Sequence, residues 1–265
     1  MKKYIGIGLA FLALAGSYIF YQTHYTKIQS IAIESEKIAE TTKIVQITDF
    51  HNCSILNLKG LIKEIQDFKP DGIAITGDII TKKQHTFERT KDFIQKLEAL
   101  EIPIFYVYGN HEVYNTELEP QLTDYLLKHK VEILHNRSIE WPDKNIKIIG
   151  TGDAYTYTDN LGEAMKGITE KTFNLMLSHS PNIIEREGLD TIDLIICGHT
   201  HGGQIRVPVV GSLIAPGQGW FPEYDQGLFE IGESKLYIDS GIGFSGPPIR
   251  TFNQSQITFI TLKAR

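Results

Sequence analysis

The chain has 265 residues and a hydrophobic content of 42%, which can form one sizeable core or two small ones. Its formal net charge of -6 argues against a protein that holds long nucleic acids, because such a protein needs a basic face, and we expect no nucleic-acid partner. The two cysteines, Cys53 and Cys197, are expected to be free thiols and not a disulfide framework.

The amino-terminal segment has the length and composition of a membrane span. Lys2 and Lys3 precede residues 4–21, which carry no formal charge. As a helix this stretch would extend about 27 Å against a hydrocarbon core of ~30 Å. We predict a retained transmembrane anchor over residues 1–22, because the apolar residues continue past the small-x-small sequence at residues 13–15. A cleaved signal peptide and a buried core helix are the alternatives.

The charges around this segment predict its orientation. Two lysines precede it and only Lys27 lies near its other end, so the amino terminus is expected in the cytoplasm. We therefore predict a single-pass protein of the cell membrane with its main domain outside the cytoplasm, a prediction that leaves the cytoplasmic face open. A stem over residues 23–42, with one strand at 28–33, leads to the main domain over residues 43–265.

The main domain begins with alternating strands and helices. Strands are predicted at residues 44–48, 72–76 and 104–108, and helices at residues 57–68, 86–100 and 118–128. The first helix shows the pattern most clearly, because Leu58, Leu61, Ile62 and Ile65 recur with helical spacing. Strands that alternate with helices predict a parallel sheet with right-handed crossovers.

The second half of the chain is richer in strands and predicts mixed or antiparallel sheet. Its strands are expected at residues 146–149, 173–177, 194–197, 228–231, 235–238 and 257–262. We therefore predict an α/β (α+β) fold in which two mixed β-sheets pack as a sandwich and are flanked by helices.

Five of the predicted strands run directly into residues of types that bind metals. These residues are Asp49 and His51, Asp78, Asn110, His179, and the pair His199 and His201. Any one of them alone is more typical of a turn or a helix cap. The carboxyl ends of strands in an open α/β sheet line the crevice where ligands bind, however, and five such ends together indicate one cluster.

The chemistry of the cluster indicates which ion it holds. Carboxylates, imidazoles and one amide, with no thiolate among them, suit divalent manganese, iron or zinc. Seven ligands exceed one tetrahedral site and fit two ions that share a carboxylate. Two ions about 3.5 to 4 Å apart hold a hydroxide between them, orient a phosphoryl group and offset the charge that grows on the reacting oxygens. His111, beside Asn110, is placed to donate a proton to the leaving oxygen.

Five motifs occur along the chain in a fixed order. They are Asp-x-His at Asp49, Gly-Asp at Asp78, Gly-Asn-His-Glu at Asn110, a single histidine at His179, and Gly-His-x-His at His199. Together they resemble the motifs of the calcineurin-like metallophosphoesterase family. The resemblance implies that one ion is bound by Asp49, His51 and His201, and the other by Asn110, His179 and His199. It further implies that Asp78 bridges the two ions and that His111 is the catalytic acid.

The carboxyl-terminal part resembles a narrower branch. Residues 202–208, 224–228 and 240–250 look like the bacterial membrane-associated metallophosphoesterases, a branch that includes UDP-diacylglucosamine pyrophosphatases and enzymes known only as phosphodiesterases. Arg250 is a candidate for binding a substrate phosphate, with a structural role as the alternative. The aromatic residues in 219–222 either touch a lipid surface or pack a loop.

These observations predict a membrane-anchored, dinuclear-metal phosphohydrolase. Its substrate is expected to be a phosphodiester or pyrophosphate of a lipid or envelope precursor. A broad phosphodiesterase that acts on nucleotides or cyclic nucleotides is the runner-up, and a non-catalytic metal-binding scaffold is the third reading. A UDP-diacylglucosamine substrate would place the domain in the cytoplasm, whereas the amino-terminal lysines place it outside. Glu112 either orients His111 or caps the following turn.

Overall fold

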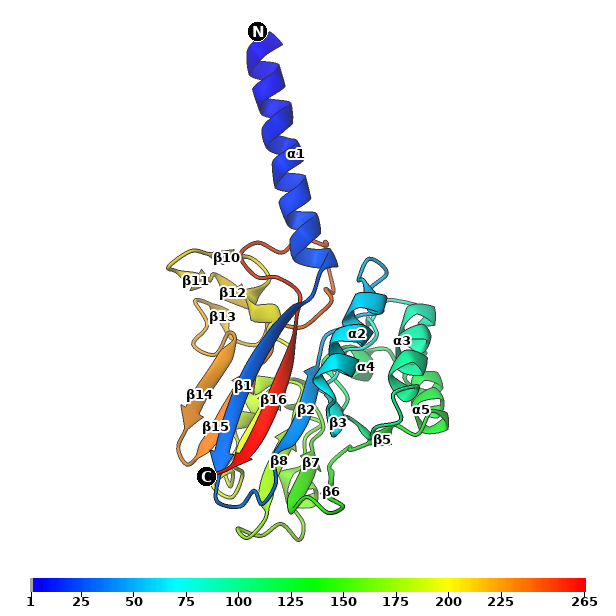
Figure 1. Cartoon of the computed structure of the whole chain (residues 1–265), viewed down its shortest axis with the longest axis vertical. Coiled ribbons are helices and arrows are strands. Elements are labelled where there is room, and N and C mark those ends of the chain that lie inside the picture. Colours follow the sequence, from blue (N-terminus) through cyan, green and yellow to red (C-terminus); the bar gives the residue numbers. More distant parts are fainter. Residues whose placement is uncertain (1) are drawn as a thin grey trace.

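The computed structural model describes residues 2–265; Met1, the first residue of the predicted anchor, lies outside the described residues. Two six-stranded sheets form the body of the protein (Figure 1). The first sheet contains, in order, β1 (Lys27–Ser35), β16 (Gln256–Ala264), β2 (Thr42–Ile47), β3 (Gly72–Ile75), β4 (Ile104–Tyr106) and β5 (Glu132–Ile133). The second contains β14 (Gly227–Ile231), β15 (Ser234–Ile238), β9 (Leu194–Cys197), β8 (Phe173–Leu177), β7 (Ile146–Gly150) and β6 (Arg137–Trp141). The prediction of two mixed sheets is confirmed.

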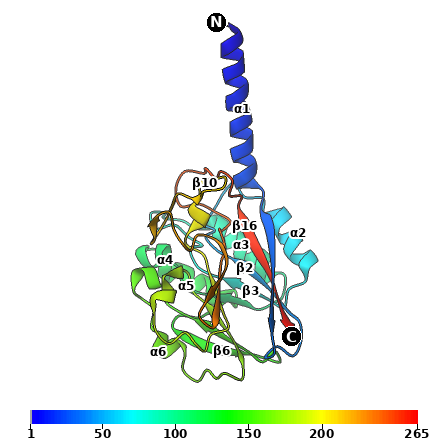
Figure 2. The ribbon, with the colours of Figure 1, turned by 90° about the vertical axis from the view of Figure 1, so that its left-hand side faces the viewer.

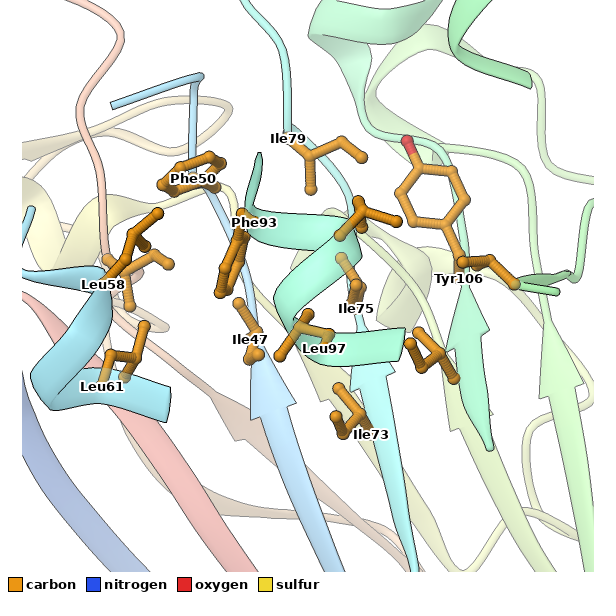
Figure 3. Packing of buried hydrophobic residues seen from close by; sticks show 14 of the residues in the cluster. Ile47, Phe50, Leu58, Leu61, Ile73, Ile75, Ile79, Phe93, Leu97 and Tyr106 are labelled. Carbon is orange, nitrogen blue, oxygen red and sulfur yellow. The ribbon is translucent and has the colours of Figure 1, made fainter. Parts of the chain in front are cut away.

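Successive side chains along the central strands face opposite sides of the sheet, and this divides the core into layers. Ile73 and Ile75 of β3 face the helices, whereas Ala74 between them faces the second sheet. Figure 3 shows the helical side, where Leu58 of α2 (Leu58–Phe68) and Phe93 of α3 (Glu88–Glu98) pack over the strands. The helix α5 (Glu119–Lys128) belongs to the same layer. The central strands β2, β3 and β4 are apolar along most of their length because they are buried on both sides.

The order of the strands differs from what the chain order suggests. β2, β3 and β4 are parallel, as predicted, but the last strand, β16, lies between β1 and β2. In the second sheet β7, β8, β9 and β15 are parallel, and β6 and β14 are antiparallel strands on its two edges. The segment predicted as a stem over residues 23–42 contains β1, which covers the strand predicted at 28–33, pairs along its whole length with β16 and is part of the first sheet.

The remaining elements are short and lie around the strand ends. They are α4 (Asn110–Tyr114), α6 (Leu161–Ala164), η1 (Ala154–Thr156), η2 (Pro181–Glu185), η3 (His201–Gly203), and two small hairpins formed by β10 (Arg206–Val207) with β11 (Gly211–Ser212) and by β12 (Ile214–Ala215) with β13 (Gly219–Trp220). Both cysteines are buried free thiols, as predicted.

The amino-terminal helix α1 (Lys2–His24) projects from the domain (Figures 1 and 2). It is long and apolar enough to cross a membrane, a property that signal sequences near the amino terminus share, and its apolar window is not buried inside the protein. The alternative of a buried core helix is therefore wrong. Its last turn is fixed to the domain, because the carbonyl of Gln22 accepts a hydrogen bond from the amide of Ser255 at 2.8 Å and the carbonyl of His24 accepts one from Asn57 at 3.3 Å.

The strand ends that carry the predicted ligands lie at the α1 end of the sheet. β1 starts directly after α1, and its first residue, Lys27, is paired with Gln256 at the start of β16. β16 runs antiparallel to β2 and pairs Thr258 with Gln46, so the carboxyl end of β2 also lies there. β3 and β4 run parallel to β2 and end at the same edge.

Candidate metal centre

All seven predicted ligands lie in loops that follow strands, or at the first residue of a short helix, and all are buried. They are Asp49 and His51 after β2, Asp78 after β3, Asn110 at the start of α4, His179 after β8, and His199 and His201 after β9. The two sheets therefore contribute to one cluster, as the comparison of strand ends predicted.

The first group consists of Asp49, His51 and His201. Oδ1 of Asp49 lies 3.5 Å from Nε2 of His201 and 3.7 Å from Nε2 of His51. The two Nε2 atoms are 3.3 Å apart. All three side chains offer one donor atom to a common point.

The second group consists of Asp78, Asn110, His179 and His199. Nε2 of His179 lies 3.2 Å from Oδ2 of Asp78, 3.1 Å from Oδ1 of Asn110 and 3.1 Å from Nδ1 of His199. Oδ2 of Asp78 also lies 3.8 Å from Nε2 of His51, so this carboxylate connects the two groups.

The spacing of these donor atoms fits divalent metal ions. A tetrahedral ion with bonds of about 2.0–2.1 Å has ligand atoms about 3.3–3.4 Å apart, which is close to the separations observed here. Oδ1 of Asp49 is buried and has no hydrogen-bond partner, although a buried carboxylate oxygen normally requires one. An ion between the donors would satisfy this oxygen and separate imidazole nitrogens that otherwise face each other.

The backbone of the cluster is strained. Five of the candidate ligands have left-handed backbone conformations, with φ of 55° at Asp49, 51° at His51, 54° at Asp78, 69° at His199 and 51° at His201. Residues other than glycine rarely adopt this region, and such strain collects at functional sites where packing enforces it. The strain turns these side chains inward at the ends of their strands.

Two glycines allow the loops to approach one another. A Cβ atom at Gly198 would lie 2.0 Å from Oγ1 of Thr48 and 2.5 Å from Oδ2 of Asp49. A Cβ atom at Gly109 would lie 2.2 Å from Oδ1 of Asp78. A side chain at either position would therefore force the loops apart.

Hydrogen bonds behind the cluster fix the candidate ligands. Nδ1 of His179 lies 2.8 Å from the carbonyl of Thr76, so the ring nitrogen that carries a proton faces away from the cluster and Nε2 is free. Nδ2 of Asn253 donates to the carbonyl of His201 at 2.6 Å. Oγ1 of Thr48 donates to Oδ2 of Asp49 at 2.9 Å. The sequence did not identify these supporting residues, because a backbone carbonyl and a remote asparagine leave no local pattern.

Glu112 connects the loops after β3 and β4. Its Oε2 accepts the amides of Asp78 and Gly109, both at 2.8 Å, and its Oε1 accepts the amide of Ile80 at 3.0 Å. The role seen is neither of the two left open by the sequence, because Glu112 caps the start of its own helix, α4, at Gly109 and holds the loop after β3. Burial, followed by the nearby charge of Asp78, raises the pKa of Glu112 to about 7.

Burial keeps several of the imidazoles neutral. It lowers the pKa of His199 and of His201 to about 3, with further lowering from His179 and His51 respectively. A neutral imidazole has the lone pair that a metal requires. Burial opposes ionisation of Asp78, but the charge of His179 outweighs burial and lowers the pKa of this carboxyl. Burial also opposes protonation of His51 and His179, but Asp49 and Asp78 outweigh burial and raise the pKa of these two imidazoles. The cluster thus combines ionised carboxylates with two neutral imidazoles, His199 and His201, and two that bind a proton more readily.

His111 lies at the margin of the cluster. Its Nδ1 accepts a hydrogen bond from the amide of Lys82 at 3.1 Å, so the neutral ring carries its proton on Nε2. That nitrogen lies 4.0 Å from Oδ2 of Asp78. Burial lowers the pKa of His111 to about 4. The structure thus directs an N–H group toward the cluster.

Arg250, the candidate for phosphate binding, lies inside the loop that carries it. Its side chain is fully buried, and Nη2 donates to the carbonyls of Ser240 at 2.9 Å and Gly243 at 2.7 Å. The guanidinium is buried in its own loop, and its Nε and Nη1 atoms have no hydrogen-bond partner among the described residues. The contacts of Nη2 favour the structural alternative, and the phosphate-binding role of Arg250 stays a prediction.

The comparison with known proteins agrees with this geometry. Residues 42–203 match the family model of the calcineurin-like phosphoesterases. The chain belongs to this family. The phosphodiesterase YaeI of Escherichia coli K12 is 30% identical over 76% of this chain and 75% of its own length. A metallophosphoesterase of Aquifex aeolicus is 29% identical over 95% of this chain and 97% of its own.

Further relatives define how far the likeness extends. The metallophosphoesterase Cj0846 of Campylobacter jejuni is 32% identical over 90% of this chain, which spans only 64% of that relative. The crystal structure of TT1561 of Thermus thermophilus covers 76% of this chain and 90% of its own, with a TM-score of 0.50 and 14% identity, and shares the fold. As a family member with this cluster, the protein is a phosphoester hydrolase, and its clustered side chains suit divalent metals.

Proposed function

We propose that the protein is a membrane-anchored phosphodiesterase with a dinuclear metal centre that acts on a lipid-linked envelope precursor. The convergence of seven candidate ligands and His111 in one buried cluster carries this proposal. The phosphodiesterase among the relatives supports diester cleavage.

The two groups of donor atoms support a division of the ligands. Asp49, His51 and His201 would hold one ion. Asn110, His179 and His199 would hold the other, and Asp78 would be shared, because its Oδ2 lies near both groups. Two bound divalent ions would activate water and stabilise the charge on the phosphoryl oxygens.

The residues of the chain supply the remaining steps. The fixed carboxylates and imidazoles would hold the two ions in place, and the ions would in turn orient the phosphoryl group. Nε2 of His111 carries its hydrogen on the side of the cluster. As the imidazolium, the form that the negative charge of a bound phosphate would favour, His111 would donate this proton to the leaving oxygen and return to the neutral ring.

The position of the cluster supports a lipid-linked substrate. The strand ends that carry the cluster and the base of α1 lie at the same end of the first sheet. With α1 in a bilayer, the site would lie close to the headgroups. The amino-terminal lysines favour a domain outside the cytoplasm, and the likeness of residues 202–208 to the branch with UDP-diacylglucosamine pyrophosphatases gives the alternative substrate.

The first experiment measures the activity of the full chain in detergent with manganese, before and after chelation. Bis(p-nitrophenyl) phosphate, p-nitrophenyl phosphate and UDP-diacylglucosamine are compared. We expect diester cleavage that chelation abolishes, and its loss in Asp78→Asn. His85→Asn is the matched control, since His85 is exposed and pairs only with Glu117 on the surface.

The outcomes separate the hypotheses. Preference for UDP-diacylglucosamine would indicate that the domain lies in the cytoplasm and not outside it. Cleavage of soluble nucleotides in preference to lipid substrates would support the broad phosphodiesterase. Bound metal without turnover of any substrate would support the scaffold, and full activity in Asp78→Asn would refute the metal centre.

A further inference from the structure

Exposed apolar side chains gather on the two small hairpins and on the loop beside them. We call the following set the apolar rim: Val207, Val209, Val210, Trp220, Phe221 and Phe252. Trp220, Phe221 and Phe252 are 71%, 67% and 61% exposed. Large apolar side chains exposed on neighbouring segments mark a contact with another molecule or with a membrane.

The tip of the first hairpin carries valines where turn chemistry disfavours them. β10 and β11 are joined by residues 208–210, and Val209 at their centre has φ of 73° and is fully exposed. Glycine, asparagine and aspartate suit this conformation, whereas a β-branched residue in it is an outlier. A tip facing only water gives no reason for valine here.

The apolar rim is joined to the base of α1. The ring of Phe252 lies 5.9 Å from that of Tyr18, and its amide donates to the hydroxyl of Tyr18 at 3.0 Å. The amide of Arg206 in turn donates to the carbonyl of Thr251 at 3.0 Å, which ties β10 to the same segment. Figures 1 and 2 show β10 beside the base of α1.

The same segment also holds the candidate metal centre. Asn253, next to Phe252, donates to the carbonyl of His201. Nε2 of Gln204, three residues after His201, donates to the carbonyls of Pro247 and Ile249 at 3.0 and 3.1 Å. These hydrogen bonds connect the segment of Phe252 with the loop that carries His201.

We propose that the apolar rim inserts into the interface of the lipid bilayer that α1 spans and holds the metal centre against the headgroups. The occupant is the bilayer, because α1 is an unburied helix of membrane length in direct contact with the rim. This inference rests on the membrane anchor of the proposed function. It specifies the substrate as a phosphodiester whose phosphate lies at headgroup level.

The test uses the full chain in vesicles of phosphatidylcholine and phosphatidylglycerol. Both native cysteines are buried, so Val210→Cys accepts an environment-sensitive NBD label selectively. We expect blue-shifted fluorescence that nitroxide-labelled phospholipid quenches. Glu233→Cys is the matched control, because Glu233 is exposed in the turn before β15, at the end of the second sheet opposite to His199. Equal lack of quenching at both positions would overturn the proposal.

A second variant tests whether the valines drive insertion. Val209→Asn suits the left-handed backbone, so the protein should fold with an unreduced melting temperature. Added to Val210→Cys, it should weaken membrane contact about tenfold, the factor that burial of one valine supplies. Unchanged quenching would contradict insertion by apolar contact.

Hydrolysis of bis(p-nitrophenyl) phosphate by the same samples reports the metal centre separately. Quenching without hydrolysis would refute the proposed function and support insertion of the apolar rim into the bilayer. Hydrolysis without quenching would refute insertion of the apolar rim and would be consistent with the proposed function.

Discussion

Phe50 links the hydrophobic core to the candidate metal centre. It lies between Asp49 and His51 in the chain, is fully buried, and packs against Phe93 of α3 with ring centroids 4.7 Å apart (Figure 3). We predict that Phe50→Ala lowers both the stability of the protein and its affinity for metal, because this ring holds the strained loop in place.

The size of both effects follows from the packing. Removal of a buried aromatic side chain lowers the free energy of unfolding by about 3–5 kcal/mol. At ~2–4 °C per kcal/mol for a domain of this size, the melting temperature falls by roughly 6–20 °C. Asp49 and His51 have φ of 55° and 51°, which costs on the order of 1–3 kcal/mol each. If the loop of the variant relaxes by about 1.4–2.8 kcal/mol when no metal is bound, metal binding must restore this strain, and the affinity for metal falls about 10- to 100-fold.

The control is Phe93→Ala, which removes the partner ring from α3. In detergent and after chelation, we expect Phe93→Ala to lower the melting temperature about as much as Phe50→Ala does. Its affinity for manganese, measured in competition with a chromogenic chelator, should fall less than that of Phe50→Ala. Equal metal affinities in the two variants would refute the argument that Phe50 holds the ligand loop.

Three further predictions concern individual contacts. His111→Gln should lower kcat about 10²- to 10⁴-fold for diesters with an alkoxide leaving group and much less for p-nitrophenolate, which leaves without a proton; equal losses would exclude an acid role. Gly198→Ala should abolish manganese binding, measured by calorimetry, because the added Cβ would overlap Thr48 and Asp49; retained affinity would show that the loops can separate. Burial raises the pKa of Asp239 to about 6. Since the folded state then binds the proton more tightly, this group makes the protein less stable as pH rises from about 4 to 6, by roughly 3 kcal/mol in all. Asp239→Asn should lack this slope in urea unfolding, and parallel pH profiles would contradict the assignment.

The sequence predicted those features that depend on local pattern. Leu58, Leu61 and Ile65 recur with helical spacing and are buried in α2. The strands that end in Asp78 and His179 were equally visible, because an apolar run is followed at once by a polar ligand. The cluster was predictable because parallel strands bring their carboxyl ends to one edge.

Features that depend on distant pairing were not predictable. β1 was assigned to a stem because its partner, β16, lies at the other end of the chain, and its own residues alternate only weakly between buried and exposed. Arg250 follows a Pro-Pro turn, and only the folded loop shows that its guanidinium points inward. Asn253 is likewise identified only by its contact with His201.

The cluster draws residues from both sheets, and this has a consequence for folding. An ion held by Asp49 and His201 would close a chain segment of about 150 residues, as a covalent crosslink does. By analogy with a disulfide of that span, the lost chain entropy of the unfolded state is worth on the order of 5 kcal/mol. Metal removal should therefore lower the free energy of unfolding of the whole sandwich, so that the ions would stabilise the fold as well as act on the substrate.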